Sequence, residues 1–351
     1  MPPPSLNALP LQRRQVLCAA AVAAGWQAIT PAHAAAGAAV AAPPPEKARD
    51  LRAWLMRIHA AASQQSFVGT FVVSAAGGLS SSRIAHFCVG SDQYERIESL
   101  DGQARQVLRH NDTVYTFWPE ARAVQIERRS QIATFPALLQ AGETRIDAFY
   151  DLHAPGSDRV AGRTAVVLQL SPRDKLRFGL RLCADRATGL LLRVEVLGEQ
   201  GEVLESSAFS DVTIGVKPRP GSVLLPMKQV EGYRVLRPTL VSSNLEAQGW
   251  ALRQGVPGFE QVSCVKRPLS SLPGDDREGA VEVLQAIYAD GLTYVSLFVE
   301  PYDEARHRRP MLTSIGATHT LMRRDGDWWV TAVGDVPGAT LRRFAAALEH
   351  K

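Results

Sequence analysis

The spacing of apolar positions changes along the chain, and each spacing predicts a different kind of secondary structure. Near residue 50, apolar residues recur every three or four positions, which predicts one amphipathic helix. These positions are Ala48, Leu51, Trp54, Leu55, Ile58 and Ala62. From Phe67 onward the period falls to two, which is the spacing of side chains on one face of a strand.

Ten short strands are predicted before residue 215, and the first six follow one another too closely for parallel crossovers. They are Phe67–Ser74, Arg83–Val89, Tyr94–Ser99, Gln103–Arg109, Thr113–Trp118, Ala123–Arg128, Thr164–Leu170, Arg177–Ala184, Leu190–Leu197 and Val203–Ile214. Asp101-Gly102 predicts a hairpin turn, because this pair tolerates positive φ. A helical interlude is expected at Phe135–Leu139. The pattern favours a curved antiparallel sheet.

Residues 215–248 contain four prolines and lose this rhythm, which predicts a linker because proline removes ladder donors. Regular patterning returns after Trp250 and predicts a small antiparallel sheet. Its strands are Phe259–Lys266, Val281–Tyr288, Leu292–Val299, Ala317–Arg324 and Trp328–Val333, with Asp-Gly turns at 290–291 and 325–326. A terminal helix should follow, with Pro337 in its first turn and Leu341, Phe344, Ala345 and Leu348 on one face.

The first 34 residues indicate the compartment. Arg13-Arg14, an apolar run from Val16 and the small-residue motif Ala32-His33-Ala34 together predict a secretory signal peptide, by a general or twin-arginine route. No later stretch is apolar for the length that a spanning helix needs. We therefore expect a soluble periplasmic protein. After removal of the signal peptide, its chain would begin with a low-complexity tether at 35–45. The expected domains are 46–214 and 249–351.

The net charge of +4 is reduced by export, because the signal carries two arginines and no acid, so 4 − 2 = +2 remains. The compartment and this small excess argue against nucleic acid as a partner. Three cysteines follow the signal (Cys88, Cys183 and Cys264), with spacings that fit no zinc or redox motif. Whether two of them form a disulfide stays open.

Searches for catalytic motifs are negative: the chain has no G-x-S-x-G, Walker-A, G-x-G-x-x-G or H-E-x-x-H sequence. The histidines are scattered, with no pair at ligand spacing. We therefore predict no enzyme, no catalytic residue, no metal and no cofactor. Aromatic residues crowd the first domain and are either core or the lining of an apolar cavity for an acyl chain. The candidates are Phe71, Phe87, Tyr115, Phe117, Trp118, Phe149 and Phe178.

Several segments resemble the RseB/MucB family, in the expected order and over about residues 46–346. They are Tyr94–Gly102, Gly189–Arg193, Gly201–Glu205, Gly291–Pro301, Gly316–Thr320 and Gly326–Pro337, followed by Arg342-Arg343-Phe344. The resemblance implies an α+β fold. Its first domain would be a large lipoprotein-carrier-like half-open antiparallel β-barrel with covering helices, and its second the small sheet with a terminal helix.

The resemblance also implies a function: negative regulation of an envelope-stress sigma factor of the sigma-E type. Such a protein binds the periplasmic part of a membrane-spanning anti-sigma factor and shields it from proteolysis. It releases that partner on sensing lipopolysaccharide or lipoprotein acyl chains. Candidate contacts in the small domain combine charge with aromatic surface; they are Tyr294, Arg323, Arg324 and Trp328. The alternatives are a periplasmic lipid or lipoprotein carrier and an enzyme acting on envelope material, and a homo-oligomer stays open.

Overall fold

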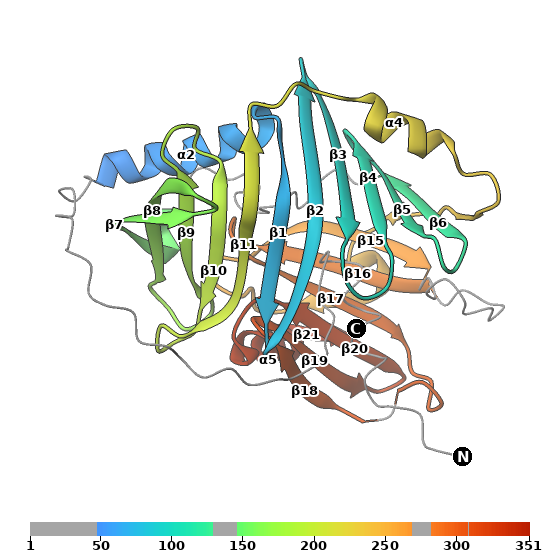
Figure 1. The fold of residues 1–351 in the computed structure, drawn as a ribbon. Coiled ribbons are helices and arrows are strands. Elements are labelled where there is room, and N and C mark those ends of the chain that lie inside the picture. The colour runs from blue at the N-terminus through green and yellow to red at the C-terminus, as the bar shows by residue number, and fades with distance from the viewer. Residues whose placement is uncertain (1–47, 129–145, 269–281, 308) are drawn as a thin grey trace.

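The computed structural model describes residues 48–128, 146–268, 282–307 and 309–351. The expected signal peptide, the tether and the helical interlude at Phe135–Leu139 lie outside these residues. The described chain forms one large, mostly antiparallel sheet, one small antiparallel sheet and a two-stranded sheet, with few helices (Figure 1). None of its helices is long and apolar enough to cross a membrane.

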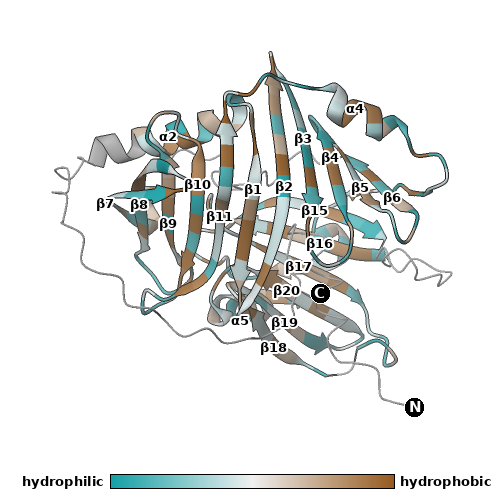
Figure 2. Cartoon of the chain, in the orientation of Figure 1, coloured by the Kyte–Doolittle hydropathy of each residue, from teal (hydrophilic) through white to brown (hydrophobic). Residues whose placement is uncertain are grey.

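The large sheet has twelve strands, in the order β12-β6-β5-β4-β3-β2-β1-β11-β10-β9-β8-β7. The bounds of its strands are β1 Phe67–Ala75, β2 Gly78–Val89, β3 Asp92–Ser99, β4 Gln106–His110, β5 Thr113–Trp118, β6 Ala123–Arg128, β7 Tyr150–Val160, β8 Arg163–Pro172, β9 Gly179–Asp185, β10 Leu191–Leu197, β11 Val203–Ile214 and β12 Arg234–Leu236. Because β12 and β7 are two separate edges, the sheet is not closed, which confirms the half-open form. Teal and brown bands alternate along strands such as β10, as the period of two requires (Figure 2).

Helices cover separate parts of this sheet. Helix α2 (Ala48–Gln64) inserts Leu55 and Ile58 into a cluster with the inward side chains of β7–β10. Helix α4 (Gly221–Lys228) inserts Val223 and Met227 among residues of β2–β6. Burial of each such side chain stabilises the fold by about 2 kcal/mol. A four-residue helix, α3 (Ile146–Phe149), precedes β7.

The small sheet has seven strands, in the order β13-β15-β16-β17-β20-β19-β18, and its core is closed by the terminal helix α5 (Gly338–Ala347). The bounds of its strands are β13 Val241–Ser242, β15 Glu260–Pro268, β16 Glu282–Ala289, β17 Tyr294–Pro301, β18 Met311–Ile315, β19 Thr318–Asp325 and β20 Trp328–Gly334. A 3-10 turn η1 (Glu246–Gln248) precedes β14 (Trp250–Leu252), which pairs with the final strand β21 (Leu348–His350). The predicted α+β class, with a small second sheet and a terminal helix, is confirmed.

Several segments differ from the patterns expected for them. Helix α5 ends at Ala347, so Leu348, which was expected on its apolar face, is extended and begins β21. Strand β18 was not predicted. Strand β7 was not predicted, because Pro155 and Gly156 break its ladder at a bulge and the side chains between its buried ends are exposed or half-buried. The stretch 215–248 contains α4 and also β12, which pairs in parallel with β6. Its first part is therefore attached to the large sheet. The proposed domain boundaries themselves stay a prediction.

A buried ion pair joins the two sheets. Arg177, just before β9, donates from Nη1 to Oδ2 of Asp290 at 2.8 Å, and neither side chain is exposed to solvent. Its Nη2 donates to the carbonyl of Pro257 at 2.7 Å and its Nε to Asp174 at 3.1 Å. The hydroxyl of Tyr150 donates to Asp290 at 3.2 Å. One guanidinium thus holds a loop of the large sheet against a hairpin of the small one.

Candidate functional site

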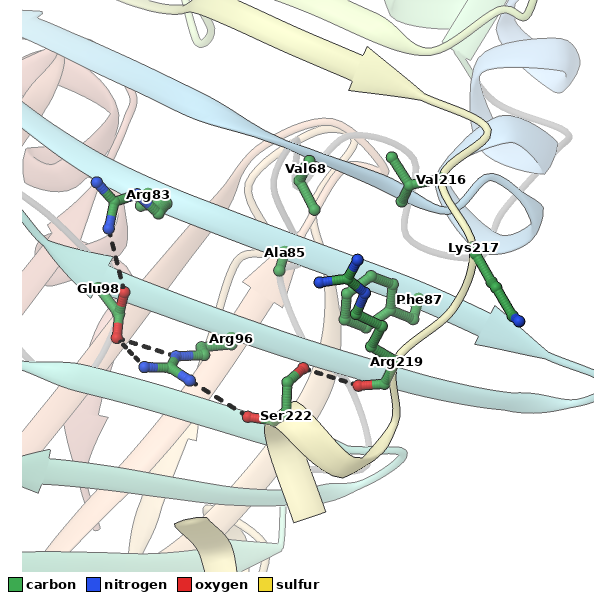
Figure 3. A pocket seen from close by; sticks show the side chains of 10 residues that line it. All are labelled: Val68, Arg83, Ala85, Phe87, Arg96, Glu98, Val216, Lys217, Arg219 and Ser222. Carbon is green, nitrogen blue, oxygen red and sulfur yellow. Dashed lines mark hydrogen bonds and ion pairs between the residues drawn. The ribbon is translucent and has the colours of Figure 1, made fainter. Parts of the chain in front are cut away.

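A pocket of about 360 Å³ lies between the large sheet and the segment that leads into α4 (Figure 3). Its floor is apolar and consists of Val68, Ala85 and Phe87 from β1 and β2, with Val216 from the crossing segment. Residues 85 and 87 share one face of β2 because side chains alternate along a strand. The apolar floor of the pocket therefore suits an aliphatic chain.

The rim of this pocket is basic: it holds Arg83, Arg96, Lys217 and Arg219 but one carboxylate, Glu98. Glu98 is shared, because Arg96 donates to it from Nε at 2.9 Å and Arg83 lies 3.8 Å away. In the described chain, Lys217 and Arg219 form no ion pair, and both are exposed. Four cations against one anion give the rim a formal charge of +3, which would attract an anionic group.

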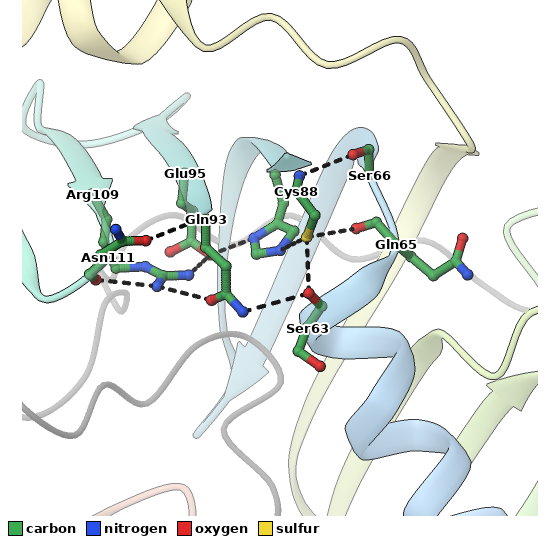
Figure 4. Close-up of polar contacts among 9 residues, drawn as sticks. Ser63, Gln65, Ser66, Cys88, Gln93, Glu95, Arg109 and Asn111 are labelled. Carbon is green, nitrogen blue, oxygen red and sulfur yellow. Dashed lines mark hydrogen bonds and ion pairs between the residues drawn. The ribbon is translucent and has the colours of Figure 1, made fainter. Parts of the chain in front are cut away.

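A second polar site, which we call the Cys88 cluster, consists of Cys88, His86, Glu95 and Arg109. On β2, His86 and Cys88 alternate with the pocket residues Ala85 and Phe87 and so lie on the opposite face. Figure 4 shows Cys88, Glu95 and Arg109 with their neighbours. Nδ1 of His86 lies 3.2 Å from Oε2 of Glu95, and its Nε2 lies 3.3 Å from Sγ of Cys88. Arg109 donates to the same Glu95 oxygen at 3.4 Å. The thiol of Cys88 donates to the carbonyl of Ser63, at the end of α2, at 3.0 Å.

Local strand geometry builds this cluster. His86 and Cys88 are two residues apart on β2 and so share a face, and the ladder sets His86 opposite Glu95 and Glu95 opposite Arg109. Phe67 stacks on the imidazole, with ring centroids 5.1 Å apart. The side chains of His86 and Glu95 are 2% and 6% exposed. The sequence signal was the His-x-Cys spacing, which becomes informative only with the strand register.

The buried groups of the Cys88 cluster shift one another's protonation. Burial alone would lower the pKa of His86, but hydrogen bonds to Cys88 and Glu95 outweigh it and raise that pKa to about 9. Burial alone would raise the pKa of Glu95, but the Arg109 guanidinium and the His86 imidazole lower it below its usual range. The cluster therefore holds a protonated imidazole near neutral pH.

The other cysteines do not combine with this cluster. Cys88, Cys183 and Cys264 are each free in the described chain. Burial raises the pKa of the Cys183 and Cys264 thiols. Within the described residues, no group of three or more metal-ligating side chains is found.

Both halves of the chain match models of one protein family. The MucB/RseB N-terminal domain matches residues 50–230, and the MucB/RseB C-terminal domain matches residues 244–349. The chain belongs to the MucB/RseB family. The resemblance carried by the sequence segments is thereby confirmed.

Members of the MucB/RseB family with similar sequences include regulators of sigma factors. The sigma factor AlgU regulatory protein MucB of Pseudomonas aeruginosa is 30% identical over 310 residues, which cover 87% of this chain and 92% of that protein. The sigma-E factor regulatory protein RseB of Escherichia coli K12 is 22% identical over 296 residues, covering 84% and 88%. A crystal structure of MucB in complex with MucA(peri) has a TM-score of 0.63 and 28% identity, covering 86% of this chain and 99% of that one.

The structure separates the aromatic residues that were expected to line one cavity. Of the seven, Phe87 lines the basic-rimmed pocket. Tyr115 and Phe117 pack under α4 in the same cluster as Phe87, and Phe71 lies in a different core cluster. Phe149 lies under the Arg177 guanidinium. Trp118 and Phe178 are buried, and the ring of Phe178 lies near His319 of the small sheet. The seven residues therefore do not form one lining.

The four candidate contact residues of the small domain do not lie together on one surface. Arg323 and Trp328 share a face, where Arg323 donates to the carbonyl of Leu348 at 3.1 Å. Arg324 lies on the opposite face, 3.9 Å from the ring centroid of Tyr302. Tyr294 and Trp328 lie at opposite ends of the β17–β20 pair. Their role as partner contacts stays a prediction, with Arg324 the exposed member.

Proposed function

We propose that this protein is a periplasmic negative regulator that binds the periplasmic part of a membrane-spanning anti-sigma factor and shields it from proteolysis. The observation that carries the proposal is the similarity across both domains to MucB, which forms a complex with MucA(peri). Binding alone performs this function, because a protease cannot cut a segment held in a folded interface. The export signal predicted at residues 1–34 supports the compartment.

The ligand that triggers release is lipopolysaccharide, whose phosphates form an anionic head, or the acylated end of a lipoprotein, which would use the apolar floor alone. The basic-rimmed pocket supports this choice. Its apolar floor suits an acyl chain, while Lys217 and Arg219 suit a phosphate or carboxylate at the mouth. The head of such a ligand would lie at the solvated basic rim, and its chain would lie on the apolar floor.

The position of the pocket also suits a role in release. Its wall includes the segment 216–222, which continues through α4 and β12 to the first strand of the small sheet. A ligand that fits the pocket better in the released state shifts the population towards release by its differential affinity. No chemical step is needed for such a shift.

The first experiment measures cleavage of the anti-sigma factor's periplasmic segment by its initiating protease, with and without this protein. Protection is expected, and equal cleavage rates would sink the proposal. Lipopolysaccharide is then titrated into the complex. Arg219→Glu should raise the concentration needed for release by about tenfold, because a charge at the rim is reversed. Arg159→Glu, an exposed arginine at the β7–β8 turn, is the matched control and should change nothing.

A second candidate function is carriage of lipid or lipoprotein across the periplasm, which the apolar floor of the pocket favours. The two functions differ in one observation. Acyl chains that co-purify with the protein, together with no affinity for the anti-sigma segment, would favour the carrier. A pull-down from the periplasm with mass spectrometry of both proteins and lipids makes this comparison in one sample.

A further inference from the structure

The Cys88 cluster has the arrangement of an activated nucleophile. A thiol lies within hydrogen-bond reach of an imidazole nitrogen, at 3.3 Å, and a carboxylate holds the other nitrogen at 3.2 Å. This order of nucleophile, base and orienting acid is the one by which cysteine side chains are made reactive. Phe67 fixes the plane of the ring by stacking. The regulatory function proposed above uses none of these groups.

The side chains around the sulfur of Cys88 carry a net positive charge when His86 is protonated. Glu95 and Arg109 balance each other, so a protonated His86 leaves one positive charge in a site where His86, Glu95 and Arg109 are buried. Among the described groups in hydrogen-bond contact with His86, Cys88 is the one that can supply a further negative charge. A thiolate gives two cations and two anions. Loss of the thiol proton would cost one hydrogen bond, the one that the thiol donates to the carbonyl of Ser63.

Access to the sulfur limits what can react with it. Cys88 is half-buried, while Cys183 and Cys264 are buried. The end of α2 and the residue after it close one side, with the carbonyls of Ser63 and Gln65 at 3.0 and 3.9 Å from Sγ. These contacts favour a small reagent over a protein disulfide. Small hydroperoxides meet this limit and react with thiolates.

We propose that Cys88 is a site of oxidation by small hydroperoxides, with His86 as its proton carrier and Glu95 as the residue that positions His86. The thiolate of Cys88 attacks one peroxide oxygen, so an S–O bond forms and the O–O bond breaks. Sulfur is oxidised by two electrons to a sulfenic acid, and the peroxide is reduced. The leaving group is hydroxide from hydrogen peroxide or alkoxide from an organic hydroperoxide. It takes the proton from Nε2 of His86 and departs as water or an alcohol.

Oxidation would change the contact between Cys88 and α2, because it removes the thiol proton that now bonds the Ser63 carbonyl. Because α2 covers β7–β10, this places an oxidant-sensitive contact at one end of a covering helix.

The first test follows alkylation of the full exported protein by iodoacetamide, with each cysteine read separately by mass spectrometry. An ion pair predicts a Cys88 rate that is nearly flat between about pH 6.5 and 8, whereas an isolated thiol gains about tenfold per pH unit. His86→Gln and Glu95→Gln should restore the steep profile, and His86→Gln should slow the reaction at pH 6.5 by at least about tenfold. A steep profile in the wild type overturns the proposal without any variant.

The second test treats the protein with hydrogen peroxide and traps sulfenic acid with dimedone. The adduct is expected on Cys88, at a rate reduced at least about tenfold in His86→Gln. Cys264→Ser is the matched control, and it should leave both the adduct and the rate unchanged. An adduct that forms equally fast in His86→Gln with its circular dichroism spectrum intact, or no adduct in the wild type, refutes the assignment.

Discussion

Neutralising Asp290 should destabilise the contact between the two sheets. Asp290→Asn keeps the size of the side chain and an oxygen for the backbone N–H groups of Leu292 and Thr293, which donate to Oδ1 at 2.9 and 2.8 Å. It removes the charge opposite Arg177, whose side chain is fully buried. The variant therefore leaves a buried cation without its nearest counter-charge.

The expected cost follows from the remaining partners of Arg177. Removal of one partner of a buried ion pair costs about 3–5 kcal/mol. Asp174 still lies 3.1 Å from Nε but is 31% exposed, so the lower end, about 3 kcal/mol, applies. With a urea m-value of about 2 kcal/mol/M, the unfolding midpoint should fall by roughly 1.5 M.

The assay is urea unfolding followed by circular dichroism and tryptophan fluorescence. Arg177→Met combined with Asp290→Asn should be more stable than the sum of the single changes predicts, because no unpaired charge remains. Asp151→Asn is the control: its partner Arg173 lies at 2.7 Å, but both side chains are about half exposed. That exposed pair should contribute at most about 1 kcal/mol. If Asp290→Asn costs no more than Asp151→Asn, the reasoning about burial is refuted.

Three further predictions follow from single sites. The pKa of His86 is raised in the folded state to about 9 from 6.5, which corresponds to about 3 kcal/mol of folding stability. This contribution should be complete below pH 6.5 and vanish as pH rises to 9. Unfolding midpoints across this range should show the loss, and His86→Gln should make them independent of pH there. Gly258→Ala should destabilise the folded protein by about 2 kcal/mol, because φ is +85° and a Cβ would lie 2.7 Å from Nη2 of Arg177. Urea unfolding measures this, and an unchanged midpoint would contradict the geometry. Phe344→Ala should lower the free energy of unfolding by about 3–5 kcal/mol, since the ring is fully buried against Phe259. Leu225 is exposed, so Leu225→Ala should lower it by less than about 0.5 kcal/mol. Equal costs would contradict the assignment of Phe344 to the core.

Local patterns predicted most of the elements correctly, because side-chain period and turn chemistry act over a few residues. The three-and-four spacing gave α2, and Leu341, Phe344 and Ala345 are buried on α5 as expected. Asp325-Gly326 begins the β19–β20 turn with Gly326 at φ +57°. The two sheets and the family resemblance follow from the same short segments.

The sites depended on register and on contacts between distant residues, which no local period encodes. Arg177 and Asp290 are 113 residues apart, and nothing near either one indicates the other. The predicted aromatic cavity was divided because alternation sends neighbours such as Phe117 and Trp118 to opposite faces of β5.

The sequence by itself thus determined most of the strands, the hairpin turns, the two amphipathic helices and the family, because each depends on residues close together in the chain. The tertiary structure decided which side chains meet. Pairing of β2 with β3 set His86 against Glu95, and packing of the end of α2 brought Ser63 to Cys88. The crossing of residues 216–222 over β1 and β2 formed the basic-rimmed pocket. These contacts arise from long-range packing, so only the folded chain contains them.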